Sequence, residues 1–373
     1  MTDEVIVEAG GRLYTGWSAV SVERGVSRAA SSFSVAVSRT HPDVGAVQAF
    51  RPGDPVVVSI GDPDGARERI LTGSIDRPTS DLSSTDHPIG LEGRSRTKDL
   101  IDCWRIDPPY QIRGRLEDIA AELCRPFGIA VETRVSTGQD IPDFRMEQGD
   151  KVWPAIEELC RLRTVFGRDT PAGDLALDRP GRRGADGALI LYGTGGADDR
   201  RNTIKSAAFD SDEGERFSPV VVRAQGVRSA DNFGRNANEV TAQALDPGVG
   251  RYRPRLVRPD RQMTTAQAQA YADWEVARAF GLSQTLTVVV DGWRQPGGAL
   301  WDAGLTIPVD IDALNVRGDW VSESVDWSVD DAGGSITTLT LRRPEAFEPA
   351  PPGGLSPQAN ETQGGAWAAV FEG

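Results

Sequence analysis

The strongest constraint on the fold is that apolar residues recur at every second position in many short runs. In SSFSVAV, for example, Phe33, Val35 and Val37 alternate with small or polar residues. This is the period of a β-strand that has one face in a core. Breaks rich in Gly and Pro separate the runs, so many turns must join the strands. The chain is therefore predicted to be mainly β, with α+β insertions.

Residues 1–102 are predicted to form a first β-barrel domain. DPVVVSIGD (residues 54–62) and ERILTGSIDRP (68–78) have the composition of two arms of a hairpin, and HPIGLEGRS (87–95) supplies a further strand. Several strands with no convincing helix among them favour a small barrel or a sandwich.

The apolar period changes over residues 103–170, which are predicted to form an α+β domain. Leu116, Ile119 and Leu123 recur at helical spacing. A second helix is expected over DKVWPAIEELCRLR, with Asp150 as its N-terminal cap.

Strand patterns return in residues 171–210 and 285–345, which together are predicted to form a second β-barrel domain similar to the first. Residues 211–284 interrupt this domain and are predicted to be an inserted α/β domain with one helix. Thr264 and Gln267 have the spacing of a capping box at the start of that helix. The chain is thus expected to hold two similar β-barrel domains and smaller α/β modules.

Two tryptophans flank a Pro-Gly-Gly break in the second predicted barrel, within VVVDGWRQPGGALWDAGLTIPV (residues 288–309). Trp293 and Trp301 are expected to be core or interface residues that cover one end of a barrel. The alternative is an aromatic platform that stacks sugars or bases, but no basic groove or second aromatic row accompanies the pair.

Residues 346–373 are predicted to be a flexible C-terminal tail, because this Pro- and Gly-rich segment cannot bury enough apolar area to fold alone. It nevertheless ends in AWAAVFEG. One hypothesis is that Trp367, Val370 and Phe371 dock on a partner protein, and the alternative is a frayed or self-packed terminus.

Residue types for catalysis are scarce, so no catalytic, metal-binding or cofactor-binding residue is predicted. The chain has only two histidines, His41 and His87, and each precedes a proline. No GxSxG motif and no phosphate-binding P-loop are present. A pair of carboxylates for glycoside hydrolysis stays possible among 55 acidic residues, because such a pair is defined only in three dimensions.

The net charge of −14 argues against a dedicated nucleic-acid surface, which needs a concentrated basic field. No apolar run is long enough for a membrane-spanning helix, so no membrane insertion is expected. The start, MTDEVIVEAGG, lacks the pattern of a signal peptide. The chain is therefore expected to be made and kept in a cytoplasm.

Taken in order, several segments resemble the baseplate hub proteins of Mu-like contractile-tailed bacteriophages. The resemblance is carried at the front by GWSAVSVERGVSRAASSFSVAV (residues 16–37) and GLEGRSRTKDLIDC (90–103). At the back, it is carried by residues 288–309 and by GGSITTLTLRRPEAF (333–347). It extends to about Phe347 and leaves out the tail.

The resemblance implies a structural protein and not an enzyme. Such hubs are homotrimers in which two β-barrels per subunit make a ring with pseudo-six-fold symmetry. The ring joins the hexameric tail tube protein to the trimeric central spike protein, contacts other baseplate proteins, and surrounds a channel for the tape measure protein and for DNA as passing cargo. The expected location is the virion, in the tail baseplate, after assembly in the host cytoplasm. The alternatives are a cell-wall hydrolase of the tail tip, or the hub of a related injection system such as a type VI secretion spike or a non-contractile tail.

Overall fold

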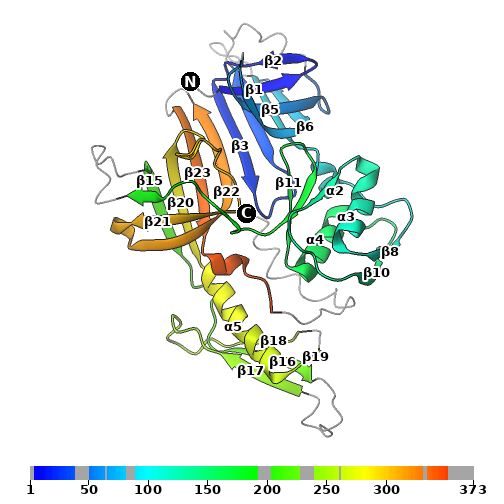
Figure 1. The fold of residues 1–373 in the computed structure, drawn as a ribbon, viewed down its shortest axis with the longest axis vertical. Helices are drawn as coiled ribbons and strands as arrows, with labels where there is room; N and C mark the ends of the chain where they lie inside the picture. The colour runs from blue at the N-terminus through cyan, green and yellow to red at the C-terminus, as the bar shows by residue number, and fades with distance from the viewer. Residues whose placement is uncertain are drawn as a thin grey trace. The chain divides into compact units, whose positions relative to one another are not determined.

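The computed structural model of the chain describes residues 4–37, 50–63, 65–80, 89–191, 203–226, 239–259, 262–330 and 334–351. The chain forms two compact units. Unit 1 comprises residues 1–210 and 285–344, and unit 2 comprises residues 211–284 and 345–373. Figure 1 shows the elements of both units.

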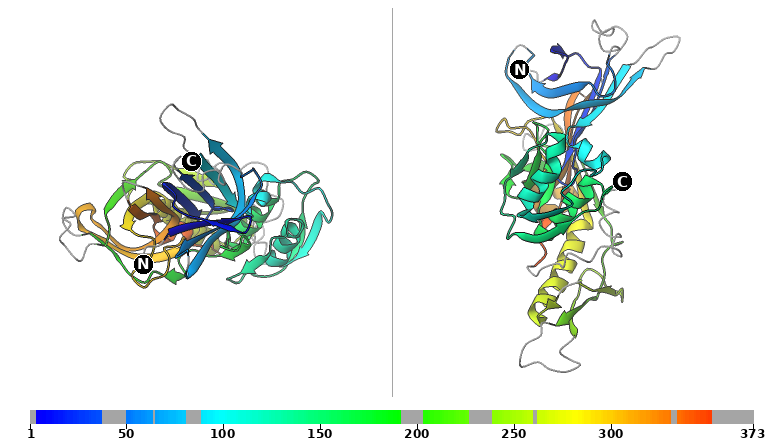
Figure 2. Two further views of the ribbon diagram at one scale, coloured as in Figure 1. Left: turned by 90° about the horizontal axis from the view of Figure 1, so that it is seen from above. Right: turned by 90° about the vertical axis from the view of Figure 1, so that its right-hand side faces the viewer.

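Unit 1 is built on one sheet of 14 strands, which confirms that the chain is mainly β. The strand order is β15-β20-β23-β22-β3-β4-β7-β6-β5-β1-β2, with β21 on β22 and with β13 and β14 on β21. Figure 2 shows in two further views that this sheet is curved and not flat. Its strands are β1 (Glu4–Ala9), β2 (Arg12–Tyr14), β3 (Ala19–Gly25), β4 (Ser32–Val37), β5 (Pro55–Gly61), β6 (Arg67–Ser80), β7 (Ile89–Ser95), β13 (Arg183–Gly184), β14 (Leu189–Leu191), β15 (Ser206–Ser211), β20 (Gln284–Asp291), β21 (Leu305–Ile311), β22 (Val316–Asp330) and β23 (Gly334–Arg342).

The sheet contains the same five-strand arrangement twice. In the first module the spatial order is β3-β4-β7-β6-β5, and in the second it is β15-β20-β23-β22-β21. In each module three consecutive strands form an antiparallel meander, and the third of them pairs with the strand that precedes the meander in the chain. The two modules therefore have the same topology.

A β-bulge with an ion pair recurs at the same place in both modules. Asp76 is the extra residue of β6 against β7, and Glu323 is the extra residue of β22 against β23. Each carboxylate meets an arginine of the third meander strand, Asp76 with Arg94 at 2.7 Å and Glu323 with Arg342 at 2.8 Å. In both cases the arginine lies opposite the residue two positions before the acid. Such agreement in register indicates structural equivalence and not a general likeness of β-sheets.

A glycine at the start of each meander gives a second point of agreement. Gly53 and Gly304 both have positive φ values, +92° and +84°, which glycine adopts without steric cost. The N–H of Gly53 donates to the carbonyl of Ile75 (2.7 Å), and the N–H of Gly304 donates to the carbonyl of Ser322 (2.7 Å). Ile75 and Ser322 each directly precede the acidic bulge residue of their module.

The two modules are fused through β22 and β3 into a single sheet. Residues Ser324–Asp330 of β22 pair antiparallel with β3, with Ser324 opposite Gly25. Within the described residues the path of the sheet ends at β15 and at β2, which are not paired with each other. The prediction of two closed barrels is therefore not confirmed, because the described strands of both modules belong to one sheet that is joined through β22 and β3.

Local signals in the sequence identified the hairpins correctly. The predicted arms around residues 54–78 form the β5–β6 pair, and β22 pairs with β23. Inward positions alternate along the strands: Val56, Val58 and Ile60 of β5 are all buried. Burial of these alternate apolar side chains is the main source of stability for a half-buried strand.

Helices dominate the segment between the two modules, which has its own apolar core. Its elements are α2 (Lys98–Asp102), β8 (Gln111–Gly114), α3 (Leu116–Cys124), η1 (Arg125–Phe127), β9 (Val131–Thr133), β10 (Ile141–Arg145), α4 (Val152–Arg163), β11 (Phe166–Asp169) and β12 (Leu175–Asp178). Leu116, Ile119 and Leu123 of α3 are buried in this core, as their spacing predicts. The expected cap of α4 is wrong: Lys151 is the N-cap, because the Asp150 carboxylate accepts the N–H of Glu147 (2.7 Å) in the preceding turn.

Unit 2 has a four-stranded sheet against which one helix packs. The elements are β16 (Val220–Gly226), β17 (Glu239–Ala244), β18 (Arg255–Val257), β19 (Gln262–Met263) and α5 (Thr265–Leu282). Two short 3-10 helices remain among the described residues: η3 (Asp312–Leu314), which belongs to unit 1, and η4 (Pro344–Phe347). The capping box of Thr264 and Gln267 is confirmed, with each side chain accepting the other residue's backbone N–H. No described helix is long and apolar enough to cross a membrane.

Candidate functional site

A cluster of buried charges lies where the three parts of unit 1 meet. Its centre is Asp302, in the turn before β21, whose carboxylate contacts three arginines. The distances are 3.4 Å to Arg24 of β3, 3.7 Å to Arg168 of β11 and 2.8 Å to Arg183 of β13. Each β module and the helical segment therefore contribute a charge to one site.

A second carboxylate, Asp169 of β11, is linked to Arg24 through Ser31. The hydroxyl of Ser31 donates to Asp169 (2.8 Å) and also accepts a hydrogen bond from the Arg24 guanidinium (3.4 Å). Arg24 is 4% exposed and Asp169 is 1% exposed. Buried charges of this kind are tolerated only when they are paired and hydrogen-bonded.

The pKa values of the two carboxyl groups are shifted in opposite directions. Burial acts to raise the pKa of Asp302, but attraction to Arg24 and Arg168 and the hydrogen bond from Arg183 outweigh it and hold this pKa below its usual value. Burial raises the pKa of Asp169, and attraction to Arg24 and the hydrogen bond from Ser31 offset only part of this effect. Asp302 therefore serves as the anion of the cluster, and Asp169 is its more readily protonated member.

The raised pKa of Asp169 leads to a test by pH. A carboxyl group with a raised folded-state pKa contributes stability that is fully present below its unfolded-state pKa, near 4, and is lost as the pH rises through the folded-state value. Asn does not titrate, so Asp169→Asn should gain stability relative to the parent chain as the pH rises from about 4 to 8. Urea unfolding of both proteins across this range measures the free energy of unfolding of Asp169→Asn minus that of the parent chain. If this difference stayed constant or fell as the pH rises, the raised pKa of Asp169 would be contradicted.

This cluster was not predicted from the sequence, although one signal was available. Val20, Val22 and Arg24 occupy alternate positions of one strand, so the arginine falls on the face that the two valines predict to be buried. A charged residue at an inward strand position implies a buried partner of opposite charge. Which acid serves as that partner follows only from the tertiary structure.

The two tryptophans that the sequence singled out lie in the same turn region and are both buried. Trp293 and Trp301 are 2% and 4% exposed. The backbone N–H of Trp301 donates to the backbone carbonyl of Trp293 (3.0 Å). The indole N–H of Trp293 donates to the backbone carbonyl of Ser328 on β22 (3.1 Å). In the single chain these side chains are packed inside the second module and do not form an accessible stacking platform.

The predicted docking residues of the C-terminal tail lie outside the described residues. Trp367, Val370 and Phe371 belong to residues 352–373, which the structure does not describe. The preceding residues do pack against α5 of unit 2: Ala346 is buried, and the Trp274 indole donates to the carbonyl of Glu348 (3.0 Å).

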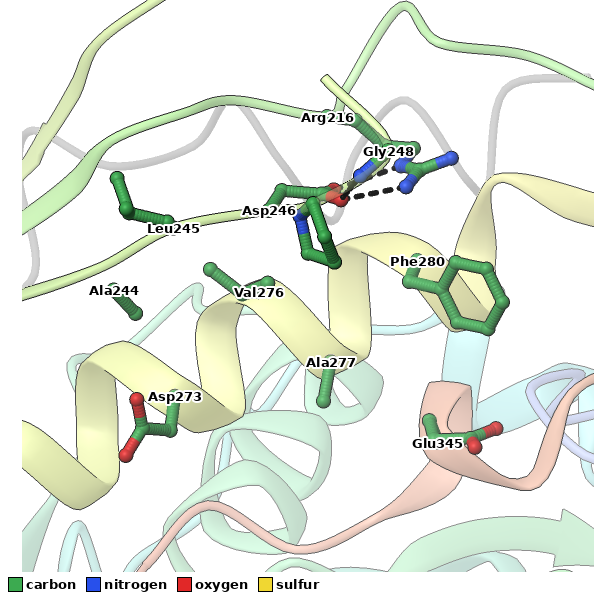
Figure 3. Close-up of a pocket in the computed structure, with 11 residues that line it drawn as sticks. Arg216, Ala244, Leu245, Asp246, Gly248, Asp273, Val276, Ala277, Phe280 and Glu345 are labelled. Carbon is green, nitrogen blue, oxygen red and sulfur yellow. Dashed lines mark hydrogen bonds and ion pairs between the residues drawn. The ribbon is translucent and has the colours of Figure 1, made fainter. Parts of the chain in front are cut away.

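Unit 2 has a shallow groove of about 720 Å³ between α5 and the end of β17 (Figure 3). Val276 and Phe280 of α5 line one side. Across the groove, Arg216 makes two hydrogen bonds to the Asp246 carboxylate, at 2.6 and 2.8 Å. Burial acts to raise the pKa of Asp246, but the Arg216 and Gly248 hydrogen bonds hold it below its usual value. This ion pair satisfies both of its charged groups, so the Asp246 carboxylate is engaged in structure.

Among the described residues, no group of three or more His, Cys, Asp or Glu side chains is placed to hold a metal ion. The arrangement in unit 1 is instead suited to fixing three segments of the chain in one geometry. The arginines of this cluster pair with the Asp302 carboxylate.

Family comparisons match three consecutive parts of the chain. Residues 4–95 match the model of the Mu phage baseplate assembly protein GpP-like N-terminal domain. Residues 97–179 match the second domain of the gp44-like baseplate hub proteins, and residues 264–350 match the fourth domain of the Mu phage baseplate assembly protein GpP.

Individual proteins match over almost the whole chain. The baseplate hub protein gp44 of Escherichia phage Mu is 29% identical over 356 residues, which cover 93% of this chain and 89% of that protein. Among solved structures, the 43 kDa tail protein of prophage MuSo2 from Shewanella oneidensis has a TM-score of 0.76 at 26% identity, covering 93% of this chain and 100% of its own. A tail protein from Neisseria meningitidis has a TM-score of 0.75 at 22% identity, covering 94% and 100%.

Proposed function

The chain belongs to the family of Mu-like phage baseplate hub proteins, and from this premise we propose that three copies form a ring that joins a hexameric tail tube to a trimeric central spike. The ring surrounds the channel for the tape measure protein and for DNA, and it contacts other baseplate proteins. It is assembled in the host cytoplasm and lies in the tail baseplate of the virion.

The observation that carries this proposal is the repeated five-strand module. Two modules of the same topology in each of three subunits provide six similar positions, which can contact a six-fold tube on one side, while the subunits themselves keep three-fold symmetry for the spike. The matching bulges, ion pairs and glycines support the equivalence of the two modules at the level of single residues.

The role is proposed to be structural and not catalytic. The matched relatives are named as baseplate hub or tail proteins. In unit 1 the Asp302 carboxylate faces Arg24 and Arg168, and in unit 2 Asp246 faces Arg216, so these two acids are used for structure.

The mass of the purified protein tests this proposal. Light scattering at micromolar concentration should give the mass of three chains, because a closed ring satisfies every copy of the interface. Peptidoglycan should not be cleared on a zymogram. A monomer at every concentration, or a cleared zone that depends on the protein, would refute the hub and favour a cell-wall hydrolase.

A further inference from the structure

The pairing of β22 with β3 within one chain, here called the seam, has a counterpart at the edge of β6 in the first module. The first part of β22 pairs with β21, and the part after the Glu323 bulge pairs with β3 along the same edge. In the first module, β5 covers the equivalent edge of β6 only as far as Ile75. Among the described residues, no strand pairs with that edge at Arg77, Pro78 and Thr79, after the Asp76 bulge.

Strand β15 is the second module's equivalent of β3. The N–H of Ser18, just before β3, donates to the carbonyl of Ala36 (2.8 Å), and the N–H of Lys205, just before β15, donates to the carbonyl of Val289 (2.8 Å). Ala36 and Val289 occupy equivalent places in β4 and β20 when the two modules are superposed through the arginines of their bulges. Counting from these bonds, Val22 corresponds to Phe209 and Glu23 corresponds to Asp210.

The outer edge of β15 corresponds to the edge of β3 that β22 covers in the seam. In the described part of the sheet, β15 pairs only with β20. Val22 of β3 is fully buried under the seam, whereas Phe209 is 36% exposed, with its ring edge-on to Trp320. An uncovered strand edge with a large apolar side chain is a template for the addition of another strand.

We propose that β15 of one subunit pairs antiparallel with the outer part of β6 in a second copy of this chain, in the register that β3 and β22 have within one chain. This inference rests on the proposed trimer and assigns the contact that closes it. The sheet of unit 1 then continues from subunit to subunit, and the contact between chains repeats the contact within a chain. In this register Thr79 lies opposite Asp210, as Asp326 lies opposite Glu23 in the seam.

The contact between chains is weaker than the seam that serves as its template. Pro78 occupies the place of Val325 and has no N–H to offer, so the ladder loses one hydrogen bond at that point. A proline on an exposed edge also discourages pairing with unrelated strands. The edge of β6 is therefore protected in the free subunit and selective in the ring.

A register-specific disulfide tests the proposal in the full chain. Directly opposite residues of antiparallel strands have Cα atoms about 4.5–5.5 Å apart, which a disulfide can span. The double variant Thr79→Cys/Asp210→Cys is made in a Cys103→Ser background, because Cys103 is the partly exposed cysteine among the three. On mild oxidation most of the protein should move to covalent dimers and trimers on a non-reducing gel, while each single variant stays at one chain.

The matched control tests the other end of the sheet. Arg12→Cys/Asp210→Cys places the second cysteine on β2, the opposite end of the strand order, and should give no cross-link. Thermal unfolding of both reduced double variants should equal that of the background, which shows that they fold.

The outcomes separate this inference from the proposed function. A cross-link through Arg12→Cys, or a trimer by mass that no Thr79→Cys/Asp210→Cys cross-link captures, overturns the β15–β6 contact and leaves the hub intact. A parent protein that stays monomeric at every concentration refutes the ring itself.

Discussion

Replacing Asp302 by alanine is expected to lower the free energy of unfolding of unit 1 by about 3 kcal/mol, because Arg24 and Arg168 lose the carboxylate that they share, while Arg168 keeps its contact with Asp178 (3.3 Å). Arg24 and Arg168 each have side chains only 5% exposed, so water cannot replace the lost carboxylate. Urea unfolding followed by tryptophan fluorescence measures the loss, since most of the tryptophans belong to unit 1.

Asp312→Ala is the matched control. Asp312 also pairs with an arginine, Arg317 at 2.9 Å, but both side chains are about 60% exposed to solvent. Removing such a surface pair should change stability far less than Asp302→Ala does. Equal effects of the two substitutions would show that the cluster does not hold the three segments together.

Trp327→Ala is expected to cost about 3–5 kcal/mol, because it empties a large space in the seam between the two modules. Trp327 of β22 is 1% exposed and lies opposite Val22 of β3 and Thr337 of β23. The guanidinium of Arg24 lies 5.4 Å from its ring centroid, so the substitution also weakens the packing of the charge cluster.

Trp104→Ala is the matched control, because it makes the same Trp-to-Ala change at an exposed position. Trp104 is 54% exposed, so its removal creates no cavity and should change stability by less than about 1 kcal/mol. Thermal or urea unfolding distinguishes the two variants. A seam that tolerates Trp327→Ala as well as the surface tolerates Trp104→Ala would mean that the modules are held together elsewhere.

Features that depend on neighbouring residues could be predicted from the sequence. The β5–β6 hairpin follows from alternation and a turn between two adjacent runs, and the start of α5 follows from the side chains of Thr264 and Gln267. Even these rules can fail by a residue: Asp150 has the right type for a cap, but the preceding turn uses its carboxylate.

Features that depend on distant pairing could not be predicted. Ser21 donates a hydrogen bond to Asp326 across the seam, although the two residues are 305 positions apart. A period of two specifies which face of a strand is buried but not which strand lies beside it. Two strand-rich segments therefore suggested two separate barrels, whereas the pairing of β22 with β3 makes one sheet. The same limitation hid the cluster around Asp302, whose members come from three distant segments.

The fusion of the two modules through β22 and β3 also bears on how the proposed ring would assemble. In such a ring, half of the contacts among the six module positions would be made within single polypeptides, where tethering gives each module a high effective concentration of its neighbour. Closure then takes three encounters in place of six, and an odd number of modules cannot arise. Covalent linkage thereby ensures, before any subunit meets another, that modules enter the ring in pairs.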